Sequence, residues 1–432
     1  MTTVAAPDPL ALLKSRSYVK LLLLAAIVGV PVSALSYGFL ELVHLLQTAL
    51  FTDLPKELGF DSAPMWWPLP LLAAAGLLTA LAIRHLPGTG GHSPADGFEP
   101  GGVTRPIDLP GVFLAALSTL SFGAVLGPEA PLIAMGSGLG ALAVKLAARD
   151  APDMAGSVIA AAGSFAAIST LMGSPLLGAF LLLEAAGLAG PMVGVVLLPG
   201  LLAAGIGSLI FIGLDDLSGL GTFSLTVPGV PEFGQPTVAM FGWALAFGLV
   251  AAPLGHAIRS IALAMRPHVE RRMVLLMPLL GLAVAGLAIG FDAATDEAAS
   301  EVLFSGQESV GPLIAGAAGW SVGALLLLIA CKGLAYAICL SSFRGGPIFP
   351  AIFIGAAAGV ASAELPGMAL VPGVAMGIGA MTAVMLNLPL TATLTAALLL
   401  GQSALDALPL VIVAVVVAHV VSARLTPAPA GA

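Results

Sequence analysis

Two segments of the chain share one spacing of glycine and proline that could bind an anion through backbone N–H groups. They read GPEAPLIAMG at 127–136 and GPIFPAIFIG at 346–355. Proline is favourable at the first positions of a helix, where its missing N–H would have had no partner. The other N–H groups of that turn carry partial positive charge and attract anions. The helix-start motif residues are Gly127, Pro128, Pro131, Gly345, Gly346, Pro347 and Pro350.

Glu129 lies inside the first segment and is the main candidate for a functional side chain. A carboxylate within a membrane segment is costly and is by default a functional hypothesis. At a helix start it would occupy the place of an anion and could leave when protonated. The alternative is a capping carboxylate that only satisfies the first N–H groups.

Four further features carry a functional and a structural interpretation each. Glu184 could transfer protons or reach the membrane interface at a helix end. Lys332 could pair with a carboxylate, extend to the surface or, less simply, contact substrate. Arg344 could concentrate anions at a pore mouth or be a solvated loop charge. The glycine-rich segment 87–94 permits close backbone approach, and His92 within it could titrate or merely be exposed.

The elements that must position these residues are membrane helices. Hydrophobic residues make up 59% of the 432, charged residues only 9%, and the net charge is −8. This composition excludes a soluble globule, a disordered chain and a nucleic-acid-binding protein. A spanning helix needs roughly 20 apolar residues, so we expect about ten to fourteen membrane segments, several of them too short to cross. We expect no soluble domain. Short Gly- and Pro-interrupted segments are typical of transport sites.

The repeated motif predicts a duplicated transporter fold. A second echo follows each copy, at Pro175 and at Pro389; chance is the alternative, because Gly (53) and Pro (33) are common. The predicted organisation is a cytoplasmic N-terminal tail at 1–17, a first repeat at 18–262, a cytoplasmic basic loop at 263–273, a second repeat at 274–423 and a C-terminal tail at 424–432. The basic residues at both cytoplasmic positions set this orientation, and the acidic stretch 292–308 would face outward.

The sequence gives no indication of a disulfide, a metal site or a catalytic site. Cys331 and Cys339 are eight residues apart in one apolar stretch, roughly 12 Å along a helix and beyond disulfide reach. The histidines lack ligand spacing, so no metal and no cofactor is expected. No nucleophile is paired with a base, so the sequence indicates no catalytic residue and no enzyme.

With these motifs the chain resembles the CLC family of chloride channels and proton-coupled chloride antiporters over about residues 20–420. A GSGxP-like segment lies at 90–94, a GxEGP-like one at 127–131 and a GGxFxP-like one at 345–350. The resemblance implies an all-α membrane protein of two inverted repeats with many short, tilted and broken helices, assembled as a homodimer. It places Glu129 at the family's gate. The residues it places along the anion path are Gly91, His92, Ser93, Ala130, Ile348 and Phe349.

Departures from the family pattern leave the anion and the coupling open. Gly91 aligns with the serine of the central anion site, and no tyrosine lies near the C-terminus to supply its second hydroxyl. Ala185 aligns with the antiporters' internal proton-transfer glutamate, one residue after Glu184. Pro128 replaces a basic residue, and Pro347 removes an N–H donor.

The expected function is transport of chloride or a similar small anion across the cell membrane, with proton counter-transport and Glu129 as the gate. The expected partners are therefore the anion, protons, the bilayer and a second copy of the chain. An uncoupled channel of the same family is the first alternative. An unrelated secondary transporter for another solute is the second, although few polar residues are available to line a larger pocket.

Overall fold

The computed structural model describes residues 13–98, 102–147, 153–187, 192–218, 227 and 230–426. Most of the predicted tail at 1–17 and of the tail at 424–432 therefore lies outside the described residues. Helices dominate the described part, which contains no strand, only one isolated bridge between Gly127 and Gly346. The all-α prediction is thereby confirmed.

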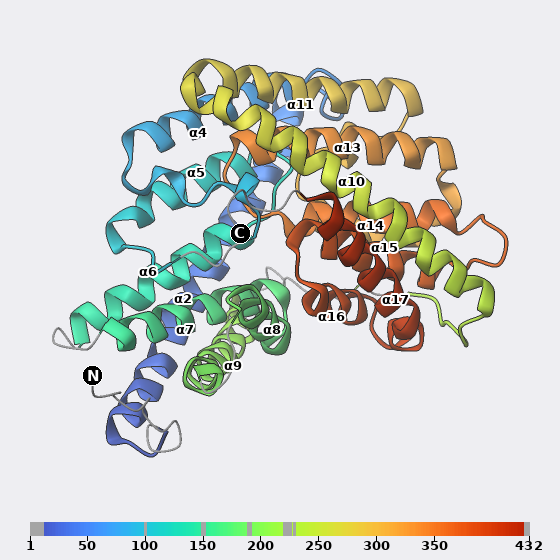
Figure 1. Ribbon diagram of the computed structural model, residues 1–432. Coiled ribbons are helices and arrows are strands. Elements are labelled where there is room, and N and C mark those ends of the chain that lie inside the picture. Colours follow the sequence, from blue (N-terminus) through green and yellow to red (C-terminus); the bar gives the residue numbers. More distant parts are fainter. Residues whose placement is uncertain are drawn as a thin grey trace. The chain divides into compact units, whose positions relative to one another are not determined.

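The α-helices are those marked in Figure 1. Their bounds are α2 Arg16–Thr48, α3 Leu54–Glu57, α4 Pro68–His85, α5 Leu109–Leu120, α6 Glu129–Ala147, α7 Asp153–Met172, α8 Pro175–Ala185, α9 Met192–Ser218, α10 Val238–Arg271, α11 Met273–Thr295, α12 Val310–Ala315, α13 Val322–Ser342, α14 Ile348–Ser362, α15 Leu370–Leu386, α16 Pro389–Leu400 and α17 Gln402–Leu425. Short turns of helix connect them: η1 Ala49–Asp53, η2 Pro87–Gly90, η3 Pro94–Asp96, η4 Pro106–Asp108, η5 Ala299–Glu301 and η6 Ala317–Gly319.

Nine helical stretches of the described residues are long and apolar enough to cross a membrane. Five shorter apolar helices of 10–17 residues accompany them, among them α8, α14 and α16. The expectation of ten to fourteen membrane segments, several too short to cross, agrees with this count. Both α8 and α16 begin at the proline of the second repeated echo, Pro175 and Pro389.

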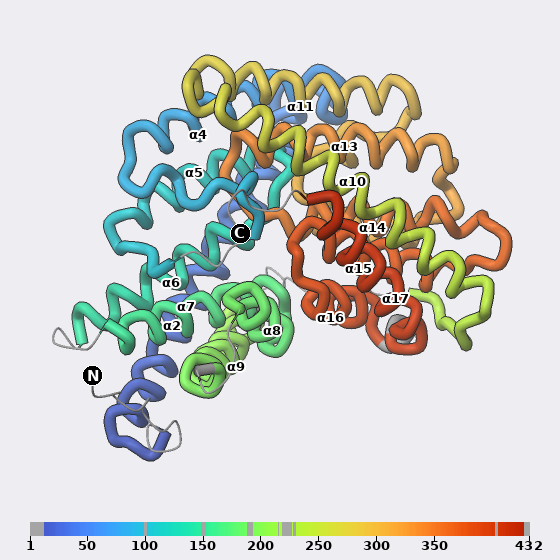
Figure 2. The backbone as a smooth tube through the Cα atoms, viewed as in Figure 1, coloured from blue at the N-terminus to red at the C-terminus, as the bar shows by residue number. Residues whose placement is uncertain are grey.

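The chain divides into two compact units that interleave along the sequence. One comprises Met1–Glu41, Glu99–Val112 and Leu132–Ser224, and the other comprises Leu42–Phe98, Phe113–Pro131 and Leu225–Ala432. In the first, α7, α8 and α9 pack on one another (Figure 2). In the second, α10, α11 and α13 run side by side, and α14 packs against α15 (Figure 1). The predicted boundary between the sequence repeats stays a prediction.

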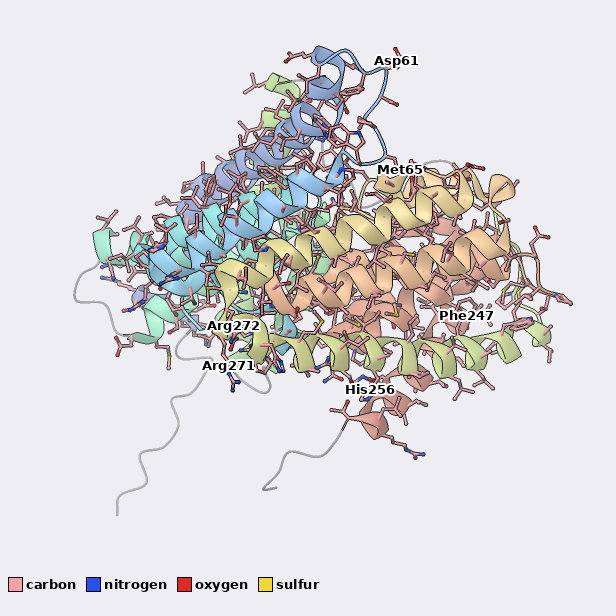
Figure 3. The ribbon with its side chains drawn as sticks, turned by 90° about the horizontal axis from the view of Figure 1, so that it is seen from above. Asp61, Met65, Phe247, His256, Arg271 and Arg272 are labelled. Carbon is pink, nitrogen blue, oxygen red and sulfur yellow. The ribbon has the colours of Figure 1, made fainter. Side chains whose placement is uncertain are left out.

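Residues 263–273 are not the loop that their charge predicts. Helix α10 continues to Arg271, and Arg272 alone connects it to α11 (Figure 3). An ion pair one helical turn apart, Arg266 Nε to Glu270 Oε1 at 2.7 Å, supports the helix here. Charged residues in this segment therefore interact along a helix face, while the side of the membrane that they face stays a prediction.

Small residues let the helices of the second unit approach closely. A Cβ added at Gly355 of α14 would meet the carbonyl of Gly377 in α15, and one added at Gly377 would meet the carbonyl of Gly355. Membrane helices gain little from hydrophobic burial against each other, so close backbone packing of this kind is a main source of their association. The position of α14 thus depends on its contact with α15.

Gly377→Ala should lower the thermal stability of the purified protein, because the added methyl group cannot fit without moving one backbone. Overpacking of this kind costs about 1–3 kcal/mol. Gly286→Ala is the matched control, since a Cβ at Gly286 in α11 would have nothing within 4 Å. Equal unfolding temperatures for the two variants in detergent would contradict the close-packing account.

Candidate functional site

The two repeated segments are joined directly through their first shared residue. The Gly127 N–H donates to the Gly346 carbonyl at 2.8 Å, and the Gly346 N–H donates back to the Gly127 carbonyl at 2.6 Å. This reciprocal pair forms the antiparallel bridge between them. Two segments more than 200 residues apart in sequence thereby place their helix starts together.

Each of the two helices begins with a proline directly before it and another at its third position. Helix α6 starts at Glu129 and α14 at Ile348. The first four N–H groups of a helix have no intrahelical partner, and proline contributes none. Two N–H groups therefore remain at each start: those of Glu129 and Ala130 in α6, and those of Ile348 and Phe349 in α14. The prolines restrict each helix start to a pair of adjacent donors.

The carboxylate of Glu129 binds the donors of the other helix. Its Oε1 accepts a hydrogen bond of 2.9 Å from the Phe349 N–H. The side chain is fully buried. Hydrogen bonds to an ionised acceptor are stronger than neutral ones. The first repeated segment thus supplies a carboxyl group to an N–H donor at the helix start of the second.

Glu129 Oε2 is bound differently from Oε1. This oxygen is buried and has no hydrogen-bond partner among the described residues. An unpaired buried acceptor is costly, and more so when it is charged. The carboxylate is therefore held from one side only, and a proton on Oε2 would relieve the cost of burying it.

Gly127 and Gly346 also provide the space that the carboxylate occupies. A Cβ at Gly346 would collide with Glu129 Oε2, and one at Gly127 would collide with both carboxylate oxygens. The glycines of the motif therefore have a steric function at this site in addition to their bridge.

One polar face of α13 supports the site. Lys332, Tyr336 and Cys339 follow the i, i+4, i+7 spacing that places side chains on one face of a helix. The Tyr336 hydroxyl donates to the Pro347 carbonyl at 2.7 Å, directly before α14. The Cys339 Sγ accepts a bond of 3.3 Å from the Val125 N–H, shortly before α6. This face is not among the predicted site residues, although the helical spacing of its polar residues within an apolar stretch is visible in the sequence.

Both main predictions for Lys332, a carboxylate partner and extension to the surface, are wrong. It is fully buried and so does not extend to the surface, and its ammonium group binds backbone carbonyls rather than a carboxylate. Lys332 nevertheless affects the pKa of a neighbouring carboxyl group, that of Glu301. Burial raises the pKa of the Glu301 carboxyl, and the charge of Lys332 opposes that rise.

The glycine-rich segment is connected to the second motif by Arg344. The Arg344 Nε donates to the Thr89 carbonyl at 3.2 Å, and its backbone N–H donates to Thr119 Oγ1 at 3.3 Å. Two residues after the segment, Asp96 pairs with Arg266 of α10. Arg344 is therefore partly engaged in structure and is not a fully solvated loop charge.

Gly91, His92 and Ser93 lie between the short turns η2 and η3 rather than at the start of an α-helix. The Gly91 N–H donates to Gly88 at 2.9 Å, the Ser93 carbonyl accepts from Asp96 at 3.1 Å, and His92 is exposed. Their place on the anion path stays a prediction.

Glu184 lies in the last turn of α8, in the other compact unit, and is half-buried. A negative charge at a helix C-terminus is unfavourable. This position does not test the predicted role of Glu184 in proton transfer, which stays a prediction. Cys331 and Cys339 are both free thiols, as their spacing predicts.

Comparison with known proteins points to one family. The sequence model described as "Voltage gated chloride channel" matches residues 96–423. Among curated proteins, "Putative ion-transport protein YfeO" of Escherichia fergusonii is 29% identical over 356 residues, which cover 80% of each chain. The protein of the same name from Escherichia coli O7:K1 is equally similar.

Solved structures show the same fold at low sequence identity. A slow cyanobacterial Cl⁻/H⁺ antiporter matches with a TM-score of 0.74 at 19% identity, covering 94% of both chains. A CLC-type fluoride/proton antiporter matches with a TM-score of 0.67 at 20% identity, covering 94% of this chain and 96% of that one. A eukaryotic CLC transporter matches at 0.70 and 16% identity, covering 95% and 72%.

Gly346→Ala should displace the Glu129 carboxylate from the start of α14, because the new methyl group would fill the space of Oε2. An experimental structure of the variant would then show Glu129 in another rotamer and the Phe349 N–H without its carboxylate partner. Gly323→Ala is the control, since a Cβ there would have nothing within 4 Å. An unmoved Glu129 in the Gly346 variant would refute the steric function of this glycine.

Proposed function

Because this chain belongs to the voltage gated chloride channel (CLC) family, we propose that it moves chloride or a similar small inorganic anion across the cell membrane in exchange for protons. Membership itself makes it a multi-pass anion transport protein and not an enzyme. One observation supports the proposed exchange of an anion for protons: the Glu129 carboxylate is bound to the Phe349 N–H at the start of α14. A mobile anion could bind in the place of this tethered one.

The gate works by protonation of Glu129. A proton on Oε2 neutralises the carboxylate and weakens its bond to the Phe349 N–H, because a neutral acceptor binds more weakly than a charged one. The side chain can then leave, and the anion takes the two N–H groups of Ile348 and Phe349. When the anion departs, Glu129 releases its proton and returns.

The anion is small and is bound mainly by backbone groups. Tyr336 lies close to α14, but a tyrosine hydroxyl has one hydrogen to donate, and this one is given to the Pro347 carbonyl. It therefore does not replace the tyrosine that the family pattern has near the C-terminus. With Gly91 at the serine position as well, the path offers few side-chain donors. The structural neighbours include a chloride/proton and a fluoride/proton antiporter, so both anions are candidates.

An uncoupled anion channel is the second candidate function. It is favoured by Ala185, which stands where the family's antiporters carry a proton-transfer glutamate. Glu184, the neighbouring carboxylate at the end of α8, is the group that could replace it in an exchanger.

Assembly and orientation follow the family in this proposal. We expect a homodimer with one anion path in each subunit. The N-terminus is expected on the cytoplasmic side, together with the basic end of α10, where Arg266, Arg271 and Arg272 gather.

Glu129→Gln should abolish the pH dependence of anion efflux from liposomes, because an amide cannot titrate, and should stop proton movement coupled to the anion. Chloride, fluoride, nitrate and bicarbonate are compared while internal pH is recorded. The control is Glu364→Gln, an exposed carboxylate after α14. Unchanged, pH-dependent flux in Glu129→Gln would exclude the gate, and anion flux without proton movement in the unmodified protein would favour the channel.

A further inference from the structure

A short segment contacts both the stretch that precedes α6 and the side of α14. This segment, residues 301–306, begins at the last residue of η5 and is called the wedge below. The Phe304 N–H of the wedge donates to the Gly123 carbonyl at 3.1 Å, four residues before the first motif begins. On its other side, Gly306 lies so close to α14 that a Cβ there would come within 2.7 Å of the Phe353 side chain. Phe353 is one turn of helix beyond Phe349.

Lys332 holds the wedge in this position. Its Nζ donates to the carbonyls of Glu301, Val302 and Leu303 at 2.8, 3.3 and 2.9 Å. The same ammonium group lies 4.3 Å from the centre of the Phe353 ring, a cation–π distance. One buried side chain thus binds the wedge and α14 together.

The three carbonyls match the donors of a lysine ammonium group. An ammonium group has three N–H donors, and three acceptors satisfy all of them. A neutral amine would have two donors and would turn its lone pair toward the third carbonyl. The three contacts of Nζ are therefore part of the geometry of the wedge.

The wedge needs this support, because its backbone is not in a relaxed conformation. Phe304 has φ 58°, in the left-handed region that bulky residues rarely adopt, and Gly306 has φ 84°. For a residue other than glycine, such as Phe304, this conformation is strained and persists only where surrounding contacts determine it. Lys332 and the Gly123 carbonyl supply those contacts.

We propose that Lys332 is a positioning residue for the Glu129 gate, acting through the wedge, a role that rests on the proposed function of Glu129. The wedge connects the segment before α6 with α14 at a second place besides the Gly127–Gly346 bridge. It therefore limits how far the two helix starts can separate. In this proposal the carboxylate leaves Phe349 more readily when the two helix starts can separate, and the wedge thereby sets how readily the gate opens.

Lys332→Met tests this role, because methionine fills a similar volume without donors or charge. With the wedge loosened, the carboxylate is released more readily, and anion efflux from liposomes at neutral pH rises several-fold at saturating anion. Lys332→Arg restores the charge and the donors and brings the flux back toward the unmodified level. Lys145→Met, which removes an exposed lysine of α6, leaves the flux unchanged.

The decisive comparison repeats Lys332→Met in the Glu129→Ala background. There the gate is absent, so the proposal expects no further change of flux. A several-fold change that persists in Glu129→Ala, or an unchanged flux of Lys332→Met alone, overturns it. If Glu129→Ala by itself behaves like the unmodified protein, the proposed gate fails instead, and the two failures are thereby distinguished.

A second variant keeps the test valid if Lys332→Met does not fold. Gly306→Ala disturbs the wedge from its other end, against Phe353, and leaves the buried charge in place. It should raise the flux in the same direction, again only when Glu129 is present. Normal flux in a folded Gly306→Ala protein whose wedge is displaced would contradict the proposal.

Discussion

The hydrogen bond from the Phe349 N–H to Glu129 Oε1 is the interaction on which the rest of the site depends. It brings a carboxylate of the first repeated segment to the helix start of the second, inside a fully buried environment. The reciprocal bonds of Gly127 and Gly346 hold the two segments in register for it. Their missing side chains leave the carboxylate room.

In a chain with 9% charged residues, the proposed anion site depends mainly on backbone N–H groups. The prolines that flank each helix start remove two donors and leave an adjacent pair, which suits one small anion rather than an extended one. The polar face of α13 then fixes the surroundings: Tyr336 binds the residue before α14, Cys339 the segment before α6, and Lys332 the wedge. These polar side chains of α13 thus all bind backbone groups, and the Phe349 N–H of α14 is bound by Glu129.

The helix starts at this site were predictable from the preference of proline for the first turn of a helix. Gly-Pro spacing located both helix starts and the carboxylate between them, because proline preferences act within one turn of helix. The starts of α8 and α16 at their prolines follow from the same rule. Contacts made across long sequence separations were not predictable in this way. The three carbonyls bound by Lys332 lie about 30 residues away from it. The high charge density of 263–273 predicted a loop, whereas the ion pair of Arg266 with Glu270 supports a helix there.

The central claim is that Glu129 and the transported anion use the same N–H groups. Its most direct test is the anomalous density of bromide in crystals of the Glu129→Ala protein. The account predicts a bromide within hydrogen-bond distance of the Ile348 and Phe349 N–H groups, where the carboxylate lies in the unmodified chain. A start of α14 that stays empty, with bromide bound at another place, would contradict it.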